Sequence, residues 1–102
     1  MRQLRITEHA ENDLVEIGTF IAKDSLVNAA RFIAAIEEHC RILATYPLIG
    51  RTRDELLPGT RSIAYGHYTI LYCILENTVQ VLRVIHSARD IKRMTRKDKL
   101  SP

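Results

Sequence analysis

The longest β-rich pattern in the chain lies between residues 58 and 90, and we expect the fold to be organised around it. From residue 68 to residue 75, large apolar side chains occupy both phases of the two-residue strand period, which predicts a strand covered on both faces. A strand of this kind sits centrally in its sheet. After a polar break, residues 79 to 85 are rich in β-branched side chains and predict the second strand of an antiparallel hairpin.

One residue interrupts the second run. Strict alternation places Val79, Val81, Arg83 and Ile85 on one face, so that a guanidinium lies between apolar side chains. Burying an arginine is costly unless it is paired or partly hydrated. The pattern therefore predicts that this face is open at one side, with Arg83 available to a partner.

The first half of the chain predicts an edge strand at residues 2 to 6 and then two amphipathic helices. Thr7 and Ser25 are good N-caps, and the apolar residues after each recur every three or four positions, to about residues 21 and 45. Because the link between them is short, these helices predict an antiparallel hairpin that packs on the later sheet. Residues 48 to 60 form a connection, and Ser87 caps a short C-terminal helix followed by a frayed basic tail at about 92 to 102.

These elements predict one α+β domain spanning residues 1 to 102. Its sheet consists of an N-terminal strand and a three-stranded antiparallel meander, and a helical hairpin covers it. The length of 102 residues suits a single domain. No apolar run is long enough for a membrane span, and acidic residues stand where a signal peptide would be apolar, so we expect a cytoplasmic protein. Cys40 and Cys73 have no ligand-spaced neighbours, and we expect no metal and no cofactor.

Charge is divided unevenly along the chain. Residues 1 to 50 hold five Lys/Arg against seven Asp/Glu, a net charge of −2, whereas residues 51 to 102 hold ten against five, a net charge of +5. A cationic half of this kind favours an acidic protein partner or nucleic acid.

Several motifs in this order resemble the RelE/ParE superfamily of toxins from bacterial type II toxin–antitoxin systems. They are Pro47 with Gly50-Arg51, Pro58-Gly59-Thr60-Arg61, Tyr68 with Tyr72, and Leu82-Arg83-Val84-Ile85-His86 followed by Arg89-Asp90. The resemblance covers almost the whole chain. It implies an antitoxin partner in a hetero-oligomer, growth arrest, and a role in plasmid stabilisation.

The resemblance leaves two targets to compare. RelE-like toxins cut messenger RNA in the ribosome, which requires a base, cations for the phosphate and an acid. RelE has two lysines and an arginine around its strand tyrosine. If that tyrosine is matched to Tyr68, this chain has Thr60, Ser62 and Thr69 instead, and none of these can act as the cation or base. The ending from His86 to Asp90 resembles the ParE branch, whose members trap DNA gyrase. We therefore expect a ParE-like toxin that inhibits gyrase by protein binding, is neutralised by a ParD-like antitoxin and is not an enzyme.

Five residues are the candidates for binding a partner: Arg61, Tyr68, Arg83, His86 and Arg89. No catalytic residue is expected on the ParE-like reading. In the alternative, a ribosome-dependent endoribonuclease, the catalytic set is Arg61, Arg83, His86 and Arg89. The simpler structural roles are an Arg61 that binds carbonyl groups of the connection or Glu55, a His86 that anchors the last strand, and an Arg89–Asp90 ion pair that caps the final helix. The basic residues from Lys92 to Lys99 are a candidate for an indirect DNA contact.

Overall fold

The order of elements in the computed structural model follows the predicted order and adds one short strand. The structure describes residues 2–100, with side chains described as far as Met94. The elements are β1 (Gln3–Ile6), α1 (Glu8–Ala22), α2 (Leu26–Thr45), β2 (Arg51–Thr52), β3 (Thr60–Tyr65), β4 (Tyr68–Leu75), β5 (Thr78–His86) and α3 (Ser87–Leu100). The predicted α+β class is confirmed.

The sheet has five strands in the order β1-β5-β4-β3-β2. β1 runs parallel to β5, and the other neighbours are antiparallel. The central place predicted for residues 68 to 75 is confirmed, because β4 has neighbours on both sides. The two-residue strand β2 was not predicted, and it forms the edge of the sheet next to β3.

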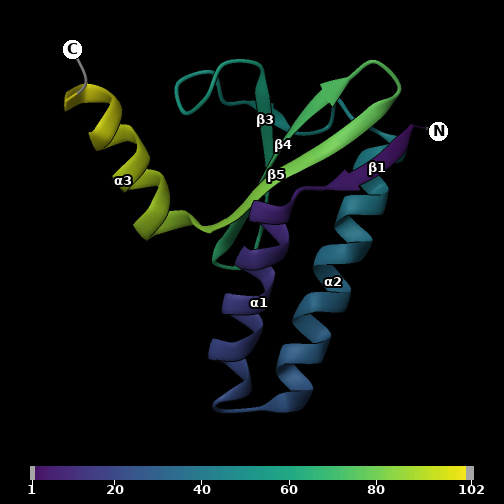
Figure 1. The fold of residues 1–102 in the computed structure, drawn as a ribbon, viewed down its shortest axis with the longest axis vertical. Coiled ribbons are helices and arrows are strands. Elements are labelled where there is room, and N and C mark those ends of the chain that lie inside the picture. The colour runs from purple at the N-terminus through teal and green to yellow at the C-terminus, as the bar shows by residue number, and fades with distance from the viewer. Residues whose placement is uncertain (1, 101–102) are drawn as a thin grey trace.

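The two long helices begin at the predicted caps. The Thr7 hydroxyl accepts a hydrogen bond from the Ala10 amide at 3.2 Å, and the Ser25 hydroxyl accepts one from the Asn28 amide at 3.1 Å. α1 and α2 lie side by side as a hairpin whose free end projects beyond the sheet (Figure 1). Their inner faces and the sheet enclose the core.

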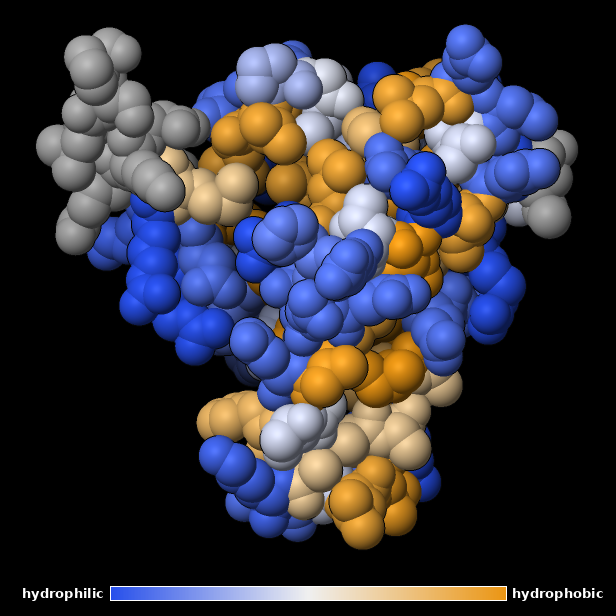
Figure 2. Space-filling view, in the orientation of Figure 1, coloured by the Kyte–Doolittle hydropathy of each residue, from blue (hydrophilic) through white to orange (hydrophobic). Residues whose placement is uncertain are grey.

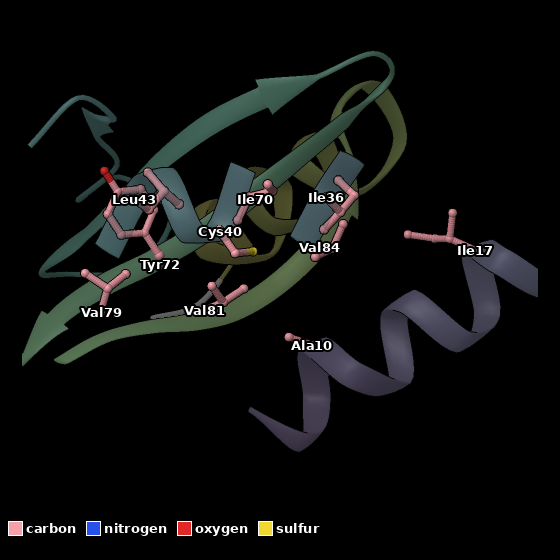
Figure 3. Close-up of a cluster of buried hydrophobic side chains, with 10 residues drawn as sticks. All are labelled: Ala10, Ile17, Ile36, Cys40, Leu43, Ile70, Tyr72, Val79, Val81 and Val84. Atoms are coloured by element: carbon pink, nitrogen blue, oxygen red, sulfur yellow. The ribbon is translucent and has the colours of Figure 1, made fainter. Parts of the chain in front are cut away.

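The core draws side chains from both helices and from the two central strands (Figure 3). Burying a large aliphatic side chain stabilises the fold by about 1.5–3 kcal/mol, so this cluster accounts for much of the stability. Its buried members are Ala10, Ile17, Ile36, Cys40, Leu43, Ile70, Tyr72, Val79, Val81 and Val84.

A β-bulge in β5 corrects the predicted alternation. The register pairs Tyr72 with Val81 but Leu71 with Arg83, so Leu82 is an extra residue in this strand. Val84 therefore joins Val79 and Val81 in the core, and Arg83 does not share their face. The prediction of an apolar face interrupted by Arg83 was wrong because a bulge reverses the phase of every later residue.

The C-terminal helix also differs from its prediction. α3 is not short, since it runs from Ser87 to Leu100 and extends away from the sheet (Figure 1). The frayed basic tail expected at about residues 92 to 102 is thus helical as far as Leu100, and its last two residues lie outside the described residues. Within residues 2–100, none of the helices combines the length and apolar composition that a membrane crossing requires.

Candidate functional site

A cleft of about 300 Å³ lies between α1, the end of β5 and the start of α3. Four of the five residues predicted to bind a partner line it: Tyr68, Arg83, His86 and Arg89. The bulge in β5 and the turn from β5 into α3 bring these four residues together. Strict alternation along β5 would not place them at one cleft. Arg61 is not among the residues that line this cleft.

Arg83 is paired within the chain. Its Nε and Nη2 atoms donate to the two carboxylate oxygens of Asp13 on α1, at 2.7 and 2.9 Å. The same carboxylate accepts the Val84 amide at 3.0 Å, where β5 has run past the end of β1. The hydrogen bond to Asp13 raises the pKa of Arg83 above its ordinary value, although burial opposes the shift. Asp13 thus pairs with the guanidinium of Arg83 and also accepts the amide at the open edge of β5.

His86 caps α3, a role we had assigned to Ser87. Its Nδ1 atom accepts the Arg89 amide at 3.2 Å, and its own amide donates to Asp90 at 2.9 Å. Since Nδ1 accepts, the neutral ring carries its proton on Nε2. Ser87 instead shares a 2.7 Å hydrogen bond with Thr69, so the prediction of a Ser87 cap was wrong.

The predicted Arg89–Asp90 pair is confirmed, with a distance of 3.0 Å between Arg89 Nε and Asp90 Oδ1. Burial of Asp90 favours its neutral form, but hydrogen bonds from Arg89 and the His86 amide and the charges of Arg89 and Arg93 outweigh it. The pKa of Asp90 is therefore lowered. The pair and the His86 cap together fix the first turn of α3.

Tyr68 and His86, which line the cleft, belong to a group of packed rings. Tyr68 packs edge-on against Phe32, with ring centroids 5.1 Å apart, and against His86 at 5.5 Å. His67 stacks on His86 at 6.2 Å. A neighbouring hollow of about 440 Å³ continues past these rings to Phe20, whose side chain is 65% exposed.

Sequence reasoning missed four residues of this region, Asp13, Glu16, Phe20 and His67, and it named Arg93 only as part of the basic tail. Three of the missed residues, Asp13, Glu16 and Phe20, come from α1, where no signal along the chain indicates which outer positions face β5 and α3. The charged residues that line the cleft are balanced, with three acids and three arginines: Asp13, Glu16, Asp90, Arg83, Arg89 and Arg93. Such a cleft can offer paired hydrogen-bonding groups to a partner, and it is not a concentrated anion site.

Arg61 lies at a different part of the sheet. Its Nη1 atom donates to the carbonyl oxygens of Gly50 at 2.7 Å and Leu48 at 3.4 Å. The structural role considered for Arg61 was binding to carbonyl groups of the connection or to Glu55. The structure shows the carbonyl contacts, and Glu55 pairs with Arg53 instead. A role of Arg61 in partner binding stays a prediction.

The three positions matched to the cationic residues of RelE are buried. Thr60 donates to the Leu57 carbonyl at 2.6 Å, and Ser62 accepts from Arg53 at 3.2 Å. Thr69 pairs with Ser87. All three hydroxyl groups are thus turned to the interior and hydrogen-bonded there.

Comparisons with known proteins agree with this fold. The profile of the ParE toxin of the type II toxin–antitoxin system, parDE, matches residues 4–91. Toxin ParE1 of Mycobacterium tuberculosis is 33% identical over 66 residues, which are 64% of this chain and 67% of that protein.

Two solved structures are also similar. The chromosomal ParDE system from P. aeruginosa has a TM-score of 0.71 at 21% identity, covering 84% of this chain and 96% of that one, and supports the fold alone. The toxin–antitoxin complex RelBE2 from Mycobacterium tuberculosis has a TM-score of 0.60 at 33% identity, covering 83% and 96%. The chain belongs to the ParE toxin family of type II toxin–antitoxin systems, within the RelE/ParE superfamily.

Proposed function

We propose that this toxin arrests growth in the cytoplasm by binding DNA gyrase, without cutting RNA, and that a ParD-like antitoxin neutralises it. The relatives do not choose between targets, since their names include both ParE and RelBE. The choice rests on the chemistry of the chain's own residues.

The observation that carries the proposal is that the candidate catalytic groups are already used within the fold. Arg83 is held by Asp13, Arg89 by Asp90, and His86 caps a helix through the nitrogen that would otherwise accept a proton. RNA cleavage also needs cations beside the phosphate and a base. The buried hydroxyls of Thr60, Ser62 and Thr69 supply neither. A surface that binds another protein has no such requirement.

Antitoxin binding is proposed from charge and from the relatives. One similar structure is titled a toxin–antitoxin complex. Residues 51 to 102 of this chain carry a net charge of +5, which favours an acidic partner. We expect the antitoxin to follow the sheet edge and the part of the helical hairpin next to the sheet, where it meets the cationic half of the toxin. For Tyr68, Arg83, His86 and Arg89, contact with gyrase or antitoxin is likewise proposed.

One observation favours the alternative, a ribosome-dependent endoribonuclease. Three arginines, a histidine and a tyrosine share one cleft, and these residue types can together serve as acid and phosphate ligands. The two functions are separated by expressing the toxin alone in bacteria. Gyrase inhibition predicts filamentous cells with cut chromosomal DNA and intact messenger RNA. Messenger RNA cut at codon-phased positions, with chromosomal DNA intact, would support the alternative.

Substitutions at His86 distinguish a helix-capping role of this residue from a role as general acid. Asparagine is a good N-cap that can accept the Arg89 amide but cannot transfer a proton. On the proposed function, His86→Asn loses at most one partner contact and therefore remains toxic, whereas His86→Ala also loses the cap and is less stable by roughly 1 kcal/mol. If His86 is a general acid, both variants lose activity by at least about 100-fold. The growth rate after induction, at matched protein levels, decides between them.

A further inference from the structure

The loop after α2 is held by four side-chain hydrogen bonds. The Tyr72 hydroxyl, at the end of a buried ring, donates to the Pro47 carbonyl at 2.7 Å and accepts the Gly50 amide at 3.0 Å. Arg61 adds its bonds to the carbonyls of Leu48 and Gly50. A Cβ atom at Gly50 would lie 2.4 Å from the Tyr72 hydroxyl, so no larger residue fits without displacing the ring. The backbone from 47 to 50 is thus fixed in one conformation.

This fixed loop presents apolar side chains to solvent. Pro47 and Gly50 are buried, while Tyr46, Leu48 and Ile49 between and beside them are 62%, 69% and 56% exposed. These three residues, here called the 46–49 patch, line a shallow hollow of about 440 Å³ with Arg2 and Thr45. Clusters of large exposed apolar residues mark interaction sites more often than single ones do.

The surroundings of the 46–49 patch indicate what binds there. Arg2 lines the hollow itself, and the exposed Arg51 directly follows the loop. Arg51 also belongs to β2, and among residues 2–100 no strand pairs with the outer side of β2. An apolar centre, a cationic rim and an open strand edge suit an extended peptide with apolar anchors and acidic flanks. A rigid loop lowers the entropy lost on binding such a peptide.

We propose that the 46–49 patch anchors an extended, acid-flanked apolar segment of the antitoxin. The inference rests on the proposed antitoxin partnership. It adds the position of the antitoxin contact, at the end of α2 rather than in the cleft of Arg83 and His86. Arg61 and Tyr72 are then positioning residues, because they act by holding the loop and not by touching the partner. Toxicity and neutralisation depend on different surfaces as a result.

The test uses the purified full-length toxin and its cognate antitoxin, obtained by co-expressing the two genes and separating the proteins. The double variant Leu48→Ser/Ile49→Ser removes the anchors from an exposed loop and leaves the buried hydrogen bonds in place. We expect the affinity for the antitoxin, measured by titration calorimetry, to fall at least about tenfold. Toxicity of the variant expressed alone should stay unchanged, and co-expressed antitoxin should no longer rescue growth.

Leu26→Ser is the matched control, because Leu26 is 77% exposed at the free end of the helical hairpin, far from the loop (Figure 1). It should change the affinity by less than about twofold, as a contact outside the hot spot does. The pair Arg2→Glu and Arg51→Glu tests the rim separately and should weaken binding most at low salt. A double variant that binds the antitoxin as tightly as the unchanged toxin overturns the inference.

Gyrase is absent from the titration, so its outcome does not depend on the target of the toxin. If the 46–49 patch instead contacts gyrase, the double variant loses toxicity while its antitoxin affinity is unchanged, which also contradicts the inference. If the unchanged toxin itself shows no complex with the antitoxin, the proposed partnership fails first. The circular dichroism and thermal midpoint of the double variant confirm that it is folded in each case.

Discussion

The cleft at the end of β5 and the loop at the end of α2 both depend on an arginine, but they use it differently. In the cleft, Arg83 and Arg89 form ion pairs in which the arginine side chains are 43% and 62% exposed and the side chains of Asp13 and Asp90 are 12% and 26% exposed. In the loop, Arg61 and the buried Tyr72 bind backbone carbonyls that have no other described side-chain partner. Exposed pairs contribute little stability, whereas a buried polar group that loses its partner is expensive.

This difference makes the surface of the cleft adaptable and the loop rigid. Arg89, at the surface of the cleft, can exchange its partner for a group of another molecule at small cost, whereas Arg83 is held to the largely buried Asp13. The loop cannot rearrange without breaking buried hydrogen bonds. Figure 2 shows hydrophilic residues gathered near the start of α3, while apolar ones are exposed at the free end of the hairpin. Charge alone therefore does not mark the surfaces of this molecule that can bind a partner.

The largest effect is expected from Gly50→Ala. The new Cβ would lie 2.4 Å from the Tyr72 hydroxyl and 2.8 Å from the Ser62 carbonyl oxygen. Overpacking together with a broken hydrogen bond should lower the free energy of unfolding by about 2–4 kcal/mol. Gly18→Ala is the control, since its Cβ would meet Ile33 at an ordinary 3.7 Å. That change should stabilise α1 by up to about 1 kcal/mol. Urea unfolding of both variants measures the difference, and equal effects would contradict a rigid loop.

Tyr72→Phe removes only the hydroxyl that joins the core to the loop. The Gly50 amide and the Pro47 carbonyl then lose their buried partner, and stability should fall by about 1–3 kcal/mol. Tyr65→Phe is a suitable control because that tyrosine packs through its ring, against Phe32 and His39. If both substitutions prove neutral in urea unfolding, the loop is not held by the hydroxyl.

The same tyrosine predicts a loss of stability in alkali. Burial raises the pKa of Tyr72 above 10, and the Gly50 amide and Arg61 oppose the shift. Above pH 10 the unfolded chain releases this proton more readily than the folded one, so stability is full below that pH and declines as pH rises through the folded pKa. Tyr72→Phe should have a shallower decline than the unchanged protein between pH 9 and pH 11. Parallel curves would show that the ring is not linked to folding in this way.

In the cleft, Asp13→Ala should have a moderate effect. Asp13 is the partner of Arg83 and also accepts the Val84 amide at the β5 edge. Losing this acceptor should lower stability by roughly 1–2 kcal/mol, and Asp13→Asn, which keeps an oxygen for the amide, should lower it less. Hydrogen exchange at the Val84 amide reports the edge directly. An unchanged exchange rate in Asp13→Ala would mean that this edge is protected by something else.

The smallest effect is expected from Arg89→Ala. The guanidinium is on the surface, and its bond to Asp90 competes with water. We expect no measurable change in the thermal midpoint, while a contact of Arg89 with gyrase would appear as reduced toxicity. A clear loss of stability in Arg89→Ala would show that the cleft is more rigid than its exposure indicates.

The sequence was sufficient for the fold because its strongest signals are local. Thr7 and Ser25 begin helices through contacts three residues away, and the two-faced apolar run of β4 places it centrally. The bulge at Leu82 could not be read in the same way, since the phase of the pattern changes only when β5 is paired with β4. β2 was missed because two residues are too short for any periodicity.

Only some of the residues that line the cleft could be picked out from the sequence, for the same reason. Tyr68, Arg83, His86 and Arg89 were identified, but their partner Asp13 lies 70 positions from Arg83 and looked like an ordinary surface acid. The His86 cap was missed because serine at position 87 is the more usual cap. Arg61 gave a signal of charge, and only the structure shows that it holds a loop.

The central claim, that this toxin acts by binding gyrase, is tested most directly in a reconstituted gyrase reaction with supercoiled plasmid and ATP. The quantity to measure is the amount of linear DNA trapped at increasing toxin concentration. We predict that linear DNA accumulates with the toxin and disappears when the antitoxin is added first. No linear DNA at any concentration, from a preparation that cuts messenger RNA on translating ribosomes, would contradict the account.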